Sequence, residues 1–153
     1  MLKAKPKNFF SRDLQILEND RPVAMVEFAW SSETGQVTIG DTHYTIRQDP
    51  PGYCSFVLED QGQIIAHARG TRTLFQHACA IEYAAKWYQL VDKSKFRRNI
   101  VVREGVQFVG YIESKHMLAQ QVSACLPEHL PLAVKAFILA LVTHLWAHQE
   151  SVI

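Results

Sequence analysis

The run PLAVKAFILALVTHLWAH, residues 131–148, carries apolar side chains on nearly every side of a helix. A surface helix has one apolar stripe, whereas a helix that is apolar all round is buried in a core or in a membrane. Pro131 is a natural helix start, because proline suits the first helical turn. From Phe10 to about Ala124 the preceding chain alternates in short stretches typical of strands. We therefore expect a sheet curled around this helix.

The same run must be weighed against a membrane span. Its longest unbroken apolar stretch is Ala136 to Val142, and Lys135, Thr143 and His144 interrupt the rest. A spanning helix needs about 20 predominantly apolar residues. We therefore predict a core helix, with insertion into a membrane or a partner as the alternative. Within a barrel, we expect the lumen to be filled by Phe137, Leu141, Leu145 and Trp146.

Turn residues divide the chain before the helix into hairpins. Gly40-Asp41 suits a two-residue primed turn, and Asp49-Pro50-Pro51-Gly52 must break any element. Consecutive hairpins predict an antiparallel meander. The strand pairs that we expect are 14–17 with 23–30, 37–39 with 43–46, 54–58 with 64–68, and 98–103 with 106–112.

Residues 74–91 fit two structures. Leu74, Ala78, Ile81, Ala85 and Tyr88 follow a helical spacing, yet the odd positions also alternate as in a strand. Periodicity alone does not separate the two. We favour two strands with a turn near residues 84–85, because aromatic and β-branched side chains dominate the odd positions.

Length and composition indicate one folded domain. The chain has 153 residues, 48% hydrophobic and 20% charged, with a formal net charge of +1. We expect a flexible lead-in over 1–10, an antiparallel barrel over 11–126 and a central helix over 131–148. The sequence shows no signal-peptide core or lipidation motif, and Cys54, Cys79 and Cys125 form no paired pattern. We therefore expect a cytoplasmic protein with reduced thiols, with peripheral membrane association as an option.

The hairpin patterns FVLEDQGQIIAHARG (56–70) and NIVVREGVQFVGYIES (99–114), followed by the hydrophobic C-terminal helix, resemble the tubby C-terminal-like superfamily. The element order is most similar to its LURP-one-like and phospholipid scramblase branches, and the resemblance covers about residues 13–148. It implies a closed antiparallel barrel of about twelve strands around a central helix. It also implies a binding or membrane-associated role. The tubby phosphoinositide motif and the scramblase calcium motif are both absent from the sequence, so the resemblance assigns no functional residue.

The strongest candidate site is the segment 92–99, DKSKFRRN. Four cations lie within six residues, and the only acid is Asp92. Arginine binds phosphate in a bidentate manner and lysine acts as a point charge. We predict a non-enzymatic binding module that recognises an anionic phospholipid or another phosphate-bearing ligand, with Phe96 contacting the membrane interface. The predicted anion-binding residues are Lys93, Lys95, Arg97 and Arg98.

The alternatives carry weaker signals. A small hydrolase or ligand-binding enzyme would use one of the three cysteines with a histidine. A protein-interaction module would expose its terminal helix to a partner. His144 and His148 share one helical face and Glu150 follows, but no complete zinc motif is present. We expect no cofactor, no metal and no catalytic residue, and the near-neutral charge argues against nucleic acid.

Overall fold

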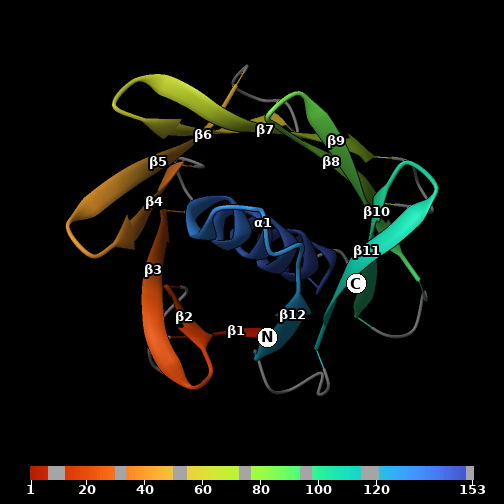
Figure 1. The fold of residues 1–153 in the computed structure, drawn as a ribbon, viewed down its shortest axis with the longest axis horizontal. Coiled ribbons are helices and arrows are strands. Elements are labelled where there is room, and N and C mark those ends of the chain that lie inside the picture. The colour runs from red at the N-terminus through yellow and green to blue at the C-terminus, as the bar shows by residue number, and fades with distance from the viewer. Residues whose placement is uncertain are drawn as a thin grey trace.

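The computed structural model describes residues 1–6, 13–29, 34–49, 55–72, 77–93, 98–114 and 121–150. In the described part, twelve strands precede one helix (Figure 1). The elements are β1 (Leu2–Pro6), β2 (Leu14–Glu18), β3 (Arg21–Ala29), β4 (Thr34–Ile39), β5 (Thr42–Gln48), β6 (Ser55–Asp60), β7 (Gln63–Arg72), β8 (His77–Tyr83), β9 (Lys86–Asp92), β10 (Asn99–Glu104), β11 (Gln107–Glu113), β12 (Val122–Cys125) and α1 (Leu132–Glu150).

The strands form one closed antiparallel barrel. Each strand pairs with its neighbours in sequence, and β1 pairs with both β2 and β12 to close the ring. The closing register sets Leu2 opposite Ala124 and Ala4 opposite Val122. Closure leaves the sheet without a free edge. The expected mainly-β meander that closes around a helix is therefore confirmed.

Helix α1 runs through the middle of the barrel (Figure 1). Phe137, Leu141 and Trp146 are buried there, as predicted, whereas the side chain of Leu145 lies outside the described residues. The helix begins at Leu132, one residue later than expected, and the Pro131 carbonyl accepts a hydrogen bond from the Lys135 N–H at 3.0 Å. The core-helix interpretation is therefore right, because the apolar faces of α1 pack against the inner wall.

The expectation of a flexible lead-in over residues 1–10 is wrong for residues 2–6. These residues form β1, which pairs with two strands and completes the barrel. Leu2 and Ala4 face the core, while Lys3 and Lys5 alternate with them toward solvent. This alternation of buried and solvent-facing residues has the period of two that is typical of a half-buried strand. Residues 7–10 lie outside the described residues.

The predicted hairpin within residues 74–91 is confirmed as β8 and β9. Ala84 and Ala85 make its two-residue turn and have φ values of 50° and 63°. A type I′ turn requires positive φ at both central residues, and its twist matches that of the flanking strands. Two alanines adopt this conformation here because the strand pairing on either side holds the turn.

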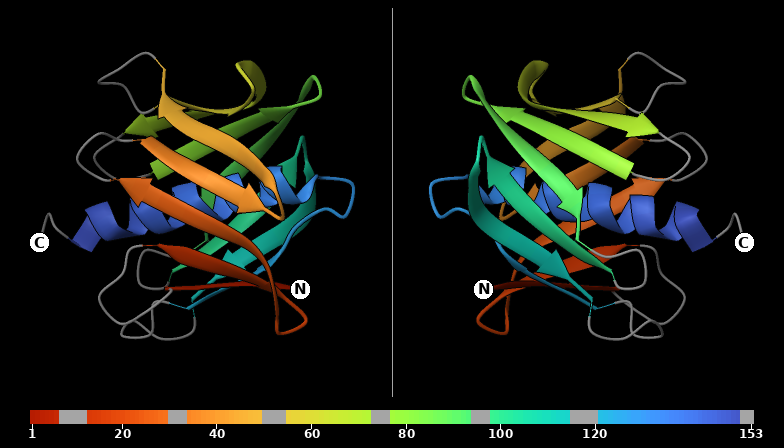
Figure 2. Two further views of the ribbon diagram at one scale, coloured as in Figure 1. Left: turned by 90° about the vertical axis from the view of Figure 1, so that its left-hand side faces the viewer. Right: turned by 90° about the vertical axis from the view of Figure 1, so that its right-hand side faces the viewer.

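The two ends of the barrel differ (Figure 2). At one end, which we call the turn end, lie the two-residue turns at 19–20, 40–41, 61–62, 84–85 and 105–106, together with the segment 126–131 that leads into α1. The strands that border the other connections begin or end at the opposite end of the barrel, which we call the loop end. The C-terminal part of α1 points out of the barrel at the loop end.

Tyr88 connects the wall to the segment before the helix. Its ring is fully buried, and its hydroxyl lies 2.7 Å from Nε2 of His129 in a hydrogen bond. Burial raises the pKa of Tyr88 above its ordinary value of 10.0, and the charge of Glu104 and the neighbouring Tyr83 raise it further.

We expect Tyr88→Phe to remove part of the alkaline loss of stability. In the parent, the unfolded tyrosine ionises near pH 10 before the folded one does, so stability is complete below that pH and falls above it. At pH 8 the variant should lose about 1 kcal/mol with the hydrogen bond. Urea unfolding at pH 8 and at pH 10.5 measures both effects. The same pH dependence in both proteins would contradict the assignment.

Candidate functional site

The basic segment predicted from the sequence begins and ends at the loop end. Strand β9 finishes at Asp92 and β10 begins at Asn99. The Lys93 N–H donates to the Asn99 carbonyl at 2.9 Å, and the Ser114 N–H donates to the Arg98 carbonyl at 3.0 Å. The backbone at both ends of the segment is therefore held by hydrogen bonds to the barrel.

The structure places two of the four predicted cations. Lys93 is exposed and Arg98 is half-buried. Lys95 and Arg97, and the predicted membrane contact Phe96, lie outside the described residues. The two placed cations border the segment on either side, and its role in binding anions stays a prediction.

Arg98 is anchored to the helix. Its guanidinium carbon lies 5.9 Å from the ring centroid of Trp146, whose side chain is 3% exposed. This distance is that of a cation–π contact. Burial lowers the pKa of Arg98 from its ordinary value. The contact also brings a cation near the C-terminal end of α1, where the helix dipole is negative. Arg98 therefore fixes the base of the segment, whereas Lys93 faces solvent.

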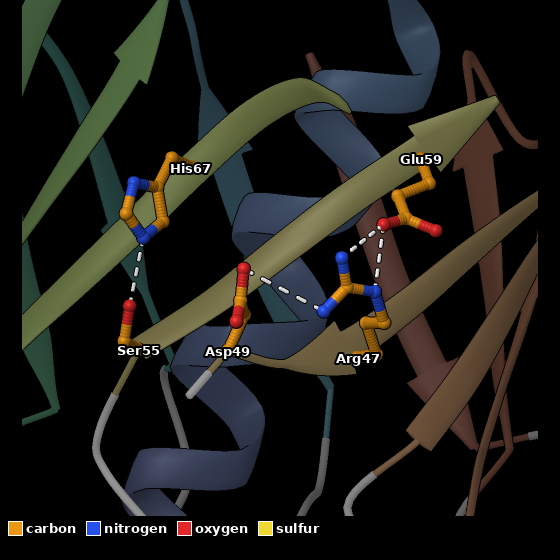
Figure 3. Close-up of polar contacts among 5 residues, drawn as sticks. All are labelled: Arg47, Asp49, Ser55, Glu59 and His67. Carbon is orange, nitrogen blue, oxygen red and sulfur yellow. Dashed lines mark hydrogen bonds and ion pairs between the residues drawn. The ribbon is translucent and has the colours of Figure 1, made fainter. Parts of the chain in front are cut away.

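A second polar cluster lies on β5, β6 and β7 (Figure 3). The Arg47 Nε–H donates to Glu59 at 2.6 Å, and a guanidinium nitrogen of Arg47 lies 3.5 Å from Asp49. The hydrogen bond that Arg47 donates to the Glu59 carboxylate is the main cause that raises the pKa of Arg47. Ser55 Oγ lies 2.7 Å from Nε2 of His67. The cluster therefore joins three neighbouring strands.

This cluster covers an outward-facing apolar residue. Val57 stands opposite Arg47 on one side and His67 on the other, and it is 1% exposed. The Asp49 N–H also donates to the Ser55 carbonyl at 2.8 Å, which closes the ends of the connection between β5 and β6. The sequence analysis missed these contacts, because partners twelve positions apart meet only once the strand register is known.

The Ser55–His67 contact has the spacing of a nucleophile and its base. Within the described residues, however, no carboxylate hydrogen-bonds the other ring nitrogen of His67 to orient it. The contact joins β6 and β7 beside the buried Val57.

The cysteine and metal alternatives gain no support. Cys79 is buried in the barrel core and Cys125 is exposed, while Cys54 lies outside the described residues. The described residues contain no group of three or more potential metal ligands. His144 is buried with its ring centroid 5.0 Å from Phe28 and 5.9 Å from Phe56. The side chain of His148 is not among those described. A cysteine-dependent activity stays a prediction.

The burial of α1 bears on the alternative in which this helix is displayed to a partner, which stays a prediction. From Ala133 to Trp146, the described side chains of α1 are buried or partly buried inside the barrel. In the described part of the chain, no helix combines the length and hydropathy that crossing a bilayer needs.

Comparison with known families, with curated proteins and with solved structures finds no match to this chain. The twelve-stranded closed barrel with a single C-terminal helix is compatible with a tubby-like fold. Function must therefore be argued from the residues of this chain.

Proposed function

We propose that this protein is a non-enzymatic binding module with a tubby-like fold, which recognises an anionic phospholipid or another phosphate-bearing ligand at its loop end. Lys93, Lys95 and Arg97 supply the positive charge, and Arg98 anchors the base of the segment. The observation that carries the proposal is the anchoring itself. The basic segment begins and ends in backbone hydrogen bonds and an arginine–tryptophan contact, with Lys93 exposed beside them.

The expected affinity follows from the number of cations. Each lysine or arginine near an anionic membrane contributes about 1 kcal/mol. Three or four of them give a dissociation constant on the order of millimolar, which is weak and reversible. Insertion of Phe96 into the membrane interface would add the free energy of apolar burial to this electrostatic attraction. Binding of this kind falls as salt rises, because the charges are screened.

We expect Lys93→Glu, Lys95→Glu and Arg97→Glu together to abolish binding to phosphatidylserine vesicles. The parent should co-sediment with these vesicles at low salt and lose binding as salt rises. It should not bind neutral phosphatidylcholine vesicles. Arg98 is left intact, because its reversal would also disturb the contact with Trp146.

A matched control reverses Lys3, Arg21 and Lys86, which lie near the turn end, and so produces the same change in net charge. This control should bind as the parent does. Equal loss of binding in both triple variants would show that net charge alone matters and would overturn the assignment to the loop end. Competition by soluble inositol hexakisphosphate separates the ligand sources. Displacement indicates recognition of phosphate groups, whereas unaffected sedimentation indicates attraction to a charged surface.

A further inference from the structure

The outer wall of the barrel carries an apolar surface over β9, β10 and β11. Trp87 is 41% exposed, Val106 is 92% exposed and Phe108 is 71% exposed. The register sets Gln89 opposite Arg103 and Arg103 opposite Phe108, so these side chains form a continuous row over three adjacent strands. Figure 1 shows β9, β10 and β11 side by side. We name the wall patch Arg69, Trp87, Gln89, Arg103, Val106 and Phe108.

The two arginines of the wall patch contact neutral groups. The guanidinium carbon of Arg69 lies 5.7 Å from the Trp87 ring centroid. One terminal nitrogen of Arg103 donates to Gln89 Oε1 at 2.6 Å, and its buried Nε has no hydrogen-bond partner. Arginine beside an exposed aromatic ring is typical of residues that dominate binding interfaces.

No described carboxylate forms an ion pair with either arginine. The carboxylate of the nearby Glu104 forms an ion pair with Lys86, with 3.6 Å between Glu104 Oε1 and Lys86 Nζ. Glu82 stands opposite Trp87 in the β8–β9 register, and no ion pair joins it to Arg69 or Arg103 among the described residues. Both guanidinium charges can therefore pair with carboxylates of a partner.

We propose that the wall patch binds an acidic protein segment that also carries aromatic or aliphatic side chains. The barrel is closed, so a partner cannot add a strand to an edge and must be held by side chains. Its carboxylates would pair with Arg69 and Arg103, in the bidentate geometry that suits guanidinium. Its apolar side chains would pack on Trp87 and Phe108.

A protein segment fits better than a nucleic acid. Nucleic-acid binding uses a broad positive surface that contacts many phosphates. The wall patch instead has two arginines next to exposed apolar side chains, which suits a segment with a few carboxylates among apolar residues. The proposal does not depend on the proposed function. Val106 is in a turn at the turn end, whereas the residues that border the basic segment, Lys93 and Arg98, lie at the loop end. The barrel could therefore hold a protein and an anionic surface together.

Fluorine NMR on protein labelled with 5-fluorotryptophan tests the proposal. The chain has three tryptophans, and Trp87→Phe identifies the resonance of Trp87. The probe is a random copolymer of glutamate and tyrosine. We expect it to shift the Trp87 resonance saturably, while polyglutamate, a lysine–tyrosine copolymer and oligouridylate have much weaker effects.

Three variants sharpen the result. Arg69→Gln with Arg103→Gln, and separately Phe108→Ser, should each weaken binding of the glutamate–tyrosine copolymer about tenfold or more, as loss of interface anchors does. Arg21→Gln removes an exposed cation on β3 and should change the affinity for the glutamate–tyrosine copolymer by less than about twofold. An unshifted Trp87 resonance, or equal affinity in the variants, would overturn the proposal. Tighter binding of oligouridylate than of the glutamate–tyrosine copolymer would indicate that the partner of the wall patch is a nucleic acid and not a protein. Vesicle binding should be the same in all these variants.

Discussion

Phe137→Ala is expected to lower the free energy of unfolding by about 3–5 kcal/mol, the largest loss that we expect from a single substitution in this chain. Phe137 is fully buried in α1 and belongs to the single core formed by the helix and the inner wall. Truncation leaves a cavity that a closed ring of paired strands cannot readily collapse into. At about 2–4 °C per kcal/mol for a chain of this size, the melting temperature should fall by roughly 10 °C.

Phe108→Ala is the matched control for this prediction. It removes the same atoms from a side chain on the outer face of β11 that is 71% exposed. We expect it to cost less than about 1 kcal/mol. Urea unfolding of the two variants compares them directly. Equal losses would mean that α1 does not fill the barrel as described.

Gly110→Ala is expected to cost about 3 kcal/mol, at the upper end of the range for overpacking. An added Cβ at this position would overlap the carbonyl oxygen of Cys125. That oxygen belongs to backbone, so it cannot rotate away. The strand β12 has only four residues and completes the ring between β11 and β1, so its displacement opens the barrel.

Gly105→Ala provides the comparison for Gly110. Gly105 has a φ of 61° with open space around the added carbon, so only the backbone conformation is penalised. We expect this to cost about 1 kcal/mol. Thermal unfolding and amide exchange of β12 should show a larger effect for Gly110→Ala. If the two variants lose the same stability, the close approach of β11 and β12 is not present in the protein.

The fold was predictable where its signals are local. The turn glycines and the alternation around them marked the hairpins, and the all-round apolar pattern of residues 131–148 marked the buried helix. Even the ambiguous stretch was assigned correctly, because its odd positions carry residues that favour strands. The turns shifted by a residue at some sites. For example, the expected strands 98–103 and 106–112 leave residues 104–105 for the turn, whereas the turn lies at residues 105–106.

The closing strand escaped prediction for a physical reason. Strand β1 closes the ring by pairing with β12, which lies more than one hundred residues away, and its own period-two alternation covers only five residues. The Arg47–Glu59 cluster and the contact between Arg98 and Trp146 were not predicted for the same reason, because their partners are also distant in the sequence. The candidate site was predicted as a run of four cations, two lysines and two arginines, that all contact the anion. The structure separates Arg98, which packs on the helix, from Lys93, which faces solvent.

Hydrogen–deuterium exchange with and without phosphatidylserine vesicles tests the central claim most directly. It reports on every segment of the unmodified chain under the same conditions. The account predicts slower exchange in peptides that span residues 93–98, with unchanged exchange at the turns 19–20 and 40–41 of the turn end. Unchanged exchange over 93–98 when the protein is vesicle-bound, or protection confined to the turn end, would contradict it.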